Sequence, residues 1–352
     1  MMAGRSSRLF GSLLLSLTLA KAGSGVAPGL HPPPSQRFQY SEPQMGVPFK
    51  LILYAPDQER ADRAAQAAYS RIAALNASLS NYETDSELSR LGYQSGRKGW
   101  TPVSLDLFRI IRHGQQMAQR SRGAFDLTIG PLAAAWRNAR RTKAFPNRDQ
   151  LDRLRRRVGW RFLQIDHARQ RVQLSRKGMR LDPGGIAKGD ALDQALKTLR
   201  NQGIHHALVA GAGDIAVAAP PPGRSAWRIE LTDFSQPHGP PPPLVALTHR
   251  AIATSGDLFQ FVELDGIRYS HIVDPRTGLG LTDRRLVTII APDGIVADSL
   301  ATALSIANED QIDTILQCYP TTSARILFLR ESGLEEKFYQ GFGRYIRSDW
   351  TP

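Results

Sequence analysis

Asp298 and Thr302 form the pair of residues whose spacing most directly suggests a metal site. They lie four positions apart in "ADSLATAL", within an apolar segment that predicts a helix. Residues four apart share one helix face, so the carboxylate and the hydroxyl can offer two hard oxygens to Mg²⁺. Taken alone, a surface acid beside a packed threonine is the more common explanation of this pair.

The segment "LDPGGIAKG", residues 181–189, places an acid, two glycines and a base at the start of a predicted helix. Glycines allow close approach to the backbone, and the free N–H groups of a helix start favour an anion. Asp182 can bond a ligand amide or ribose, and Lys188 can face a phosphate. The alternative is a capped helix start whose glycines serve close packing. The GxGxxG spacing of dinucleotide-binding folds is absent.

Two further segments combine turn residues with polar groups. In "YSHIVDPRTGLG", His271 and Asp274 lie beside a turn set by Pro275 and Gly278, and they can act on a phosphoanhydride. A histidine that merely satisfies a turn is the alternative. "AGAGDIAV" indicates a glycine turn between two strands, a pattern that is more often structural than ligand-binding.

The elements that must position these residues alternate between helix and strand. "LFQFVELDGIRYSHIV" predicts a hairpin, because Asp265-Gly266 separates two β-rich runs. Helices are expected over residues 57–80, 104–121 and 295–307, and within residues 181–204, where Gly203 ends the helix. Strands are expected over residues 49–56, 285–292 and 324–330, with a strand, turn and strand over 206–219. We therefore predict a single α/β (α+β) body in which mixed sheets are flanked by helices.

The N-terminal segment has the layout of a secretory signal. Arg5 and Arg8 precede an apolar run over residues 9–20, and "AKA" supplies small residues for cleavage. We expect a signal peptide at 1–22, a disordered Gly/Pro-rich leader at 23–42 and one domain at 43–352. The protein is then periplasmic or exported, although an uncleaved anchor stays open.

Charge and cysteine content narrow the classes of protein. The net charge is +13, and removing residues 1–22 takes away three basic residues and no acid, which leaves +10. The densest basic stretch, residues 137–161, is best explained as a solvated helix face, so we expect no nucleic-acid partner. The charge is compatible with association with the outer face of an inner membrane. A lone Cys318 excludes an internal disulfide and a cysteine-built zinc site.

Several motifs in consistent order carry a resemblance to a known family. They are "QMGVPFKLIL", "LSNYETDSELSRL", "GAFDLTIGPLAAAW", "LDPGGIAKGDALD", "LVAGAGDIAV", "ATSGD", "SHIVDPRTG" and "ADSLATAL". The chain resembles the ApbE family, the FAD:protein FMN transferases, from about Met45 to the C-terminal region. The resemblance implies a T-fold-like body that binds FAD and Mg²⁺. It also implies transfer of FMN to a Thr or Ser hydroxyl of a redox protein with a Ser/Thr-Gly-Ala-Thr-like motif, with release of AMP.

The resemblance also implies roles for individual residues. Residues expected to contact FAD are Met45, Tyr82, Ala124, Phe125, Asp126, Asp182, Lys188 and Ile272. Mg²⁺ is expected on the Gly185 carbonyl, Asp298 and Thr302. Either His271 or Asp274 is expected to take the proton of the acceptor hydroxyl.

The chain departs from the family pattern at Ala212, where a glycine is usual, and at Pro183, where leucine or a similar residue is usual. The proline-rich residues 236–243 resemble an insertion. None of these departures removes an expected ligand. Two other functions stay open: an exported FAD carrier without turnover, and a metal-dependent FAD pyrophosphatase.

Overall fold

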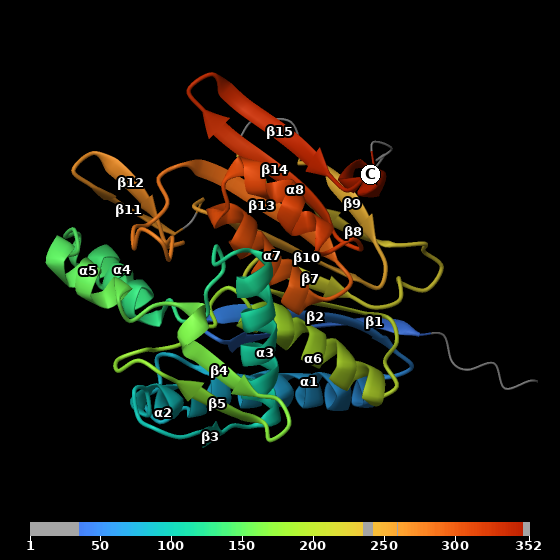
Figure 1. Cartoon of the computed structure of the whole chain (residues 1–352). Helices are drawn as coiled ribbons and strands as arrows, with labels where there is room; N and C mark the ends of the chain where they lie inside the picture. The colour runs from blue at the N-terminus through green and yellow to red at the C-terminus, as the bar shows by residue number, and fades with distance from the viewer. Residues whose placement is uncertain (1–34, 235–241, 259, 348–352) are drawn as a thin grey trace, which may run out of the picture. The chain divides into compact units, whose positions relative to one another are not determined.

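An eight-stranded sheet forms the centre of the protein (Figure 1). The structure is a computed structural model, and it describes residues 35–234, 242–258 and 260–347. In spatial order the strands are β1 (Gln36–Gln44), β2 (Val47–Ala55), β6 (Ala207–Gly211), β7 (Asp214–Val217), β10 (Arg250–Gly256), β13 (Arg284–Ala291), β14 (Ser323–Arg330) and β15 (Gly333–Tyr339). Every ladder between these strands is antiparallel.

Three helices cover one face of this sheet, in the order α1 (Gln58–Leu79), α6 (Ala187–Asn201) and α7 (Gly294–Ile306). Alternation along β2 sends Phe49, Leu51 and Leu53 into the core beneath them. Helix α7 is apolar on nearly all sides, which is typical of a helix enclosed by other elements. The helix layer thus brings two of the predicted site segments, at the start of α6 and along α7, next to each other.

The opposite face of the sheet carries a smaller three-stranded sheet. Its strands are β8 (Trp227–Glu230), β9 (Leu244–Leu247) and β16 (Ile346–Arg347). Trp227, Val245 and Phe342 pack there against outward-facing residues of the large sheet, and this forms a second core. Lys188 on α6, and Asp298 and Thr302 on α7, belong instead to the helix-covered side.

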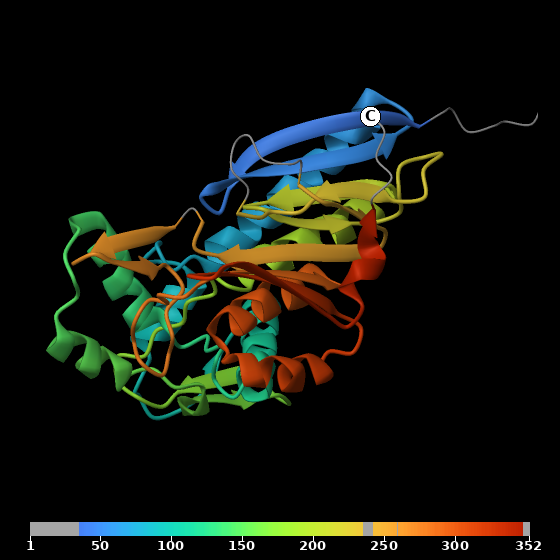
Figure 2. The ribbon, with the colours of Figure 1, turned by 90° about the horizontal axis from the view of Figure 1, so that it is seen from above.

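A third cluster joins α4 (Gly130–Thr142) and α5 (Arg148–Arg155) to the hairpin β11 (Phe261–Leu264) and β12 (Ile267–Ser270). Both views show these elements together at one side of the sheet (Figure 2). Trp136 and Tyr269 hold the cluster through rings whose centroids lie 5.0 Å apart. The hairpin is the one predicted at Asp265-Gly266, and both turn residues have positive φ, as a two-residue I′ turn requires.

Helix α3 (Leu105–Arg120) packs on α1, α7 and the 3₁₀ turn η1 (Trp160–Phe162), and its start is capped by Ser104. The remaining elements are α2 (Glu87–Tyr93), α8 (Glu309–Gln317), a small sheet of β3 (Thr101–Pro102), β5 (Arg171–Leu174) and β4 (Leu163–Asp166), and the 3₁₀ turn η2 (Phe342–Tyr345), which packs on β9, β14 and β15.

The expected α/β architecture is confirmed, with two corrections. The ladders of the described residues are all antiparallel, where the sequence suggested mixed sheets. The leader assigned to residues 23–42 is too long, because residues 36–42 belong to the edge strand β1. The proposed signal peptide lies outside the described residues. Within those residues, no helix combines the length and apolarity that crossing a bilayer requires.

Candidate functional site

Helices α6 and α7 cross at two glycines, and this crossing brings the predicted metal-binding residues together. A Cβ atom on Gly189 would lie 2.0 Å from the Gly294 carbonyl oxygen, so neither position has room for a side chain. At the crossing, the Gly189 N–H donates to Asp298 Oδ2 at 3.1 Å. The contact therefore fixes a carboxylate of α7 against the first turn of α6.

The candidate cation donors lie around this crossing. Gly185 approaches Thr302 so closely that an added Cβ would lie 2.6 Å from Thr302 Oγ1. Ser255 Oγ lies 3.5 Å from the same hydroxyl oxygen. The side chain of Asp298 is only 4% exposed. Gly185, Asp298 and Thr302, which lie far apart in the sequence, thus converge in space.

Lys188 provides the positive charge of the cluster. Its Nζ donates to the Gly184 carbonyl at 2.8 Å and lies 3.9 Å from Asp298 Oδ2. Burial opposes the charged form, but the carboxylates of Asp298, Asp214 and Asp182 outweigh it and raise the pKa of Lys188. The ammonium group therefore stays charged at neutral pH.

Asp214 belongs to the same cluster, although no motif in the sequence marked it as a site residue. It follows the glycine turn between β6 and β7, and its Oδ1 accepts from the Thr254 N–H at 3.3 Å. Its Oδ2 is buried without a hydrogen-bond partner. Burial, with the nearby charge of Asp298, raises the pKa of Asp214 well above its usual range. A buried carboxylate with an unpartnered oxygen is the chemistry that a cation can satisfy.

The donor set is therefore made of oxygens. Among the described residues, no group of three or more His, Cys, Asp or Glu is placed to hold a metal ion. Two carboxylates, a hydroxyl and a backbone carbonyl suit Mg²⁺, which prefers oxygen and completes its shell with water and substrate phosphates. The residues present thus fit the expected ion.

Asp182 is already engaged in hydrogen bonds. Its Oδ1 accepts from the Gly184 N–H at 2.9 Å, and its Oδ2 accepts from Arg137 Nη1 at 2.7 Å. The Arg137 guanidinium also lies 5.2 Å from the ring centroid of Tyr82, which is 75% exposed. Arg137 was assigned to a solvated helix face, whereas here it joins two residues expected to contact FAD.

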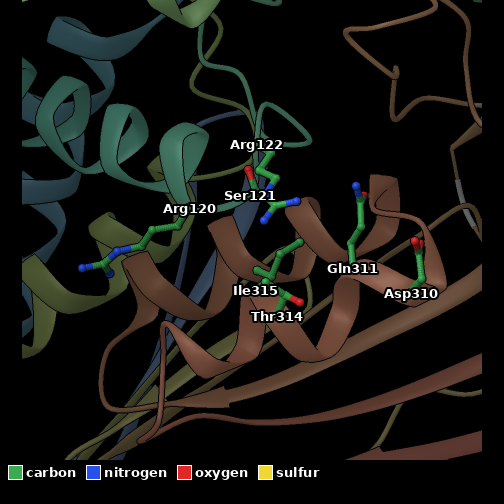
Figure 3. Close-up of a pocket in the computed structure, with 7 residues that line it drawn as sticks. All are labelled: Arg120, Ser121, Arg122, Asp310, Gln311, Thr314 and Ile315. Carbon is green, nitrogen blue, oxygen red and sulfur yellow. The ribbon is translucent and has the colours of Figure 1, made fainter.

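Tyr82 also borders a cavity of about 190 Å³ that includes Thr84, Tyr93, Arg180 and Leu181. Leu181 directly precedes Asp182, so this cavity adjoins the cluster. A second cavity, of about 120 Å³, lies between the end of α3 and α8 and contains none of the predicted site residues (Figure 3).

His271 and Asp274 have different hydrogen-bonding states. His271 Nδ1 lies 3.0 Å from the Gln260 carbonyl, and a carbonyl can only accept, so Nδ1 carries the proton and Nε2 is an acceptor. Burial lowers the pKa of His271 to about 4, with help from the charges of Arg140 and Lys188. Asp274 instead accepts from the Arg276 side chain through both carboxylate oxygens, at 2.8–3.1 Å. Of the two candidate bases, His271 has the free acceptor.

The other predicted FAD contacts lie deeper in the protein or at its periphery. Ala124, Phe125, Asp126 and Ile272 are all buried. Asp126 accepts three hydrogen bonds, from the N–H and hydroxyl of Thr128 and from the Trp160 N–H. Met45 lies in the β1–β2 turn and packs against the main core. The structure thus gives Asp126 a role in holding its own loop, and the FAD contacts of these residues stay predictions.

Comparison with known proteins decides the family. The ApbE family profile matches residues 45–326. This chain belongs to the ApbE family. A FAD:protein FMN transferase of Treponema pallidum is 32% identical over 269 residues, which cover 71% of this chain and 73% of that protein. One from Vibrio cholerae is 29% identical over 324 residues, which cover 91% of this chain and 93% of that protein.

Solved ApbE structures share the fold. The flavin transferase ApbE from Vibrio cholerae superposes with a TM-score of 0.80 at 26% identity, covering 89% of this chain and 100% of that one. The ApbE protein from Thermotoga maritima gives 0.77 at 26% identity, with the same coverage. Agreement over nearly the whole described body confirms the α/β fold expected from the motifs.

Proposed function

We propose that this chain, an ApbE-family flavin transferase, moves FMN from FAD onto a Thr or Ser hydroxyl of an exported redox protein, and that it requires Mg²⁺. The observation that carries the proposal is the convergence of Gly185, Asp298 and Thr302 beside the charged Lys188. Cleaving a diphosphate is mainly a matter of positioning groups and neutralising charge, and this cluster supplies oxygen donors and an ammonium group for both. When bound, Mg²⁺ would neutralise negative charge on the diphosphate.

In the proposed reaction, the acceptor oxygen attacks the phosphorus atom of the FMN half of FAD. The bond from that phosphorus to the bridging oxygen breaks, and AMP leaves with the bridging oxygen. The hydroxyl proton passes to His271 Nε2, which is unprotonated at neutral pH and is oriented by the Gln260 carbonyl. Lys188 stays protonated and faces the phosphates.

The acceptor and the location belong to the same proposal. The acceptor is expected to carry a Ser/Thr-Gly-Ala-Thr-like motif, as the family resemblance implies. The signal-like residues 1–22 support action in the periplasm, and the net positive charge supports association with the outer face of an inner membrane.

Mass spectrometry of such an acceptor, incubated with FAD, Mg²⁺ and the protein, tests the proposal. An acceptor heavier by one FMN, with AMP released, is the expected result. A matched acceptor whose motif hydroxyl is replaced by a methyl group should gain no mass. FMN and AMP free in solution would instead identify a FAD pyrophosphatase, and intact FAD bound to the protein would identify a carrier.

A further inference from the structure

We infer that Asp214 is an additional acidic residue of the cation site, and that its Oδ2 helps bind the divalent ion expected on Gly185, Asp298 and Thr302. The inference rests on the proposed function, because it concerns the same ion. The starting observation is that Asp214 Oδ2 is buried with no hydrogen-bond partner. Among the described residues, the hydrogen bond to the Asp214 side chain is the one that the Thr254 N–H donates to Oδ1.

A short series of contacts places Asp214 beside the expected ligands. It accepts from Thr254, whose neighbour on β10 is Ser255, and Ser255 Oγ lies 3.5 Å from Thr302 Oγ1. Helix α7 packs on β7 and β10, and α6 packs on β7. The first residue of β7 therefore lies under the α6–α7 crossing, where Asp298 is fixed.

When both carboxylates are ionised, the charges at this crossing do not balance without a further cation. Asp214 and Asp298 are 4% and 3% exposed, and the ammonium group of Lys188 is the cation nearest to them in the described cluster. Lys188 Nζ is 3.9 Å from Asp298 and also donates to a backbone carbonyl. A buried carboxylate is stable only when it is paired, protonated or bound to a metal. A divalent ion shared by the two carboxylates satisfies both, together with the unpartnered oxygen.

The competing explanation is that Asp214 only holds the β7–β10 connection through Thr254. Asp214→Asn separates the two roles, because the amide oxygen can still accept from Thr254 while the negative charge is lost. Asp257→Asn is the matched control. Asp257 is equally buried and also has one unpartnered oxygen, but Arg268 neutralises its other oxygen at 2.7 Å.

The experiment is titration of the mature protein with Mn²⁺, followed by electron paramagnetic resonance of the free ion, with and without ADP as a source of diphosphate oxygens. We expect Asp214→Asn to weaken Mn²⁺ binding at least tenfold, as Asp298→Asn should, and Asp257→Asn to stay within twofold of the wild type. Thermal unfolding without metal should not be impaired by Asp214→Asn, because the amide keeps the oxygen that accepts from Thr254 and no hydrogen bond to Oδ2 is lost.

Each other result overturns the inference in a recognisable way. If Asp214→Asn binds Mn²⁺ like the wild type while Asp298→Asn does not, Asp214 is no ligand, and the proposed function stands. If the wild type itself binds no Mn²⁺, the inference and the metal-dependent function both fall. If Asp214→Asn unfolds, Asp214→Ser, which also lacks the charge, is titrated instead, and unchanged Mn²⁺ binding there excludes the role.

Discussion

At the scale of single residues, His271 is unusual because it is already set up to accept a proton. Its Nδ1–H is used on the Gln260 carbonyl, and burial lowers its pKa to about 4. The uncharged imidazole is therefore the predominant form around pH 7, and it is lost only as the pH falls through about 4.

We expect kcat/KM for FMN transfer to be flat between about pH 6 and 8 and to decline only near pH 4, well below the usual histidine value of about 6.5. His271→Ala should lower the rate by roughly 10²–10⁴-fold, the usual contribution of a general base. Circular dichroism at each pH checks that the fold persists. The profile is measured at saturating Mg²⁺, so that the buried carboxylates of the cation site stay ionised, and an acid limb centred near pH 6.5 would then show that the imidazole is not held as described.

Lys188 makes contacts that a purely ligand-binding residue would not need. Lys188→Met keeps the aliphatic stem but removes the donor to Gly184 and the cation beside Asp298. We expect FAD affinity to fall and stability to fall by about 1–2 kcal/mol, because the carbonyl and the carboxylates lose their partner. Flavin fluorescence titration and urea unfolding measure the two effects. Lys197→Met, on an exposed position of the same helix, should change neither.

At the scale of elements, the α6–α7 crossing depends on the absence of side chains. Gly189→Ala would force a Cβ against the Gly294 carbonyl, so we expect a loss of about 3 kcal/mol, at the upper end for overpacking. Metal affinity should also fall, because Gly189 N–H fixes Asp298. Gly343→Ala, where nothing lies within 4 Å, is the control and should be nearly neutral. Equal effects in urea unfolding would mean that the helices are not packed so closely.

The β6–β7 turn contains an avoidable strain. Ala212 has φ +56°, in the left-handed region, and Gly213 follows with φ +92°. A non-glycine residue there costs about 1–2 kcal/mol, partly offset by the greater freedom of glycine in the unfolded chain. We therefore expect Ala212→Gly to stabilise the protein by roughly 0.5–1 kcal/mol in urea unfolding. A destabilised variant would show that the turn adopts another conformation in solution.

At the scale of the whole molecule, we propose that the N-terminal segment directs the protein out of the cytoplasm, where it would meet FAD and its acceptor. We expect fractionation of the host to recover a protein that begins near Gly23 outside the cytoplasm. Leu14→Arg, which places a charge in the apolar run, should leave the full-length chain inside. Recovery of unprocessed wild-type protein in the cytoplasm would contradict the export proposal.

Local patterns predicted much of this molecule, and contacts distant in sequence account for the rest. The helices that begin at Asp57 and Ser104 were predicted from local periodicity, and each of these two caps accepts from an N–H only three positions away. The hairpin turn was predicted from the adjacent pair Asp265-Gly266. The edge strand β1 was missed because "QRFQYSEPQ" is polar and contains Pro43, which an edge tolerates. The partners of Asp214 and Arg137 lie 40 and 45 residues away, so no local pattern could reveal them.

The glycine contact between α6 and α7 also limits how this protein can change over evolutionary time. Gly189 and Gly294 each fill the space that a side chain of the other helix would need. A side chain at either position would force the two helices apart. Their separation would move Asp298 away from Gly185 and dismantle the site. Among relatives that keep the reaction, the two positions should therefore retain glycine together, whereas relatives that have lost it should be free to vary at both.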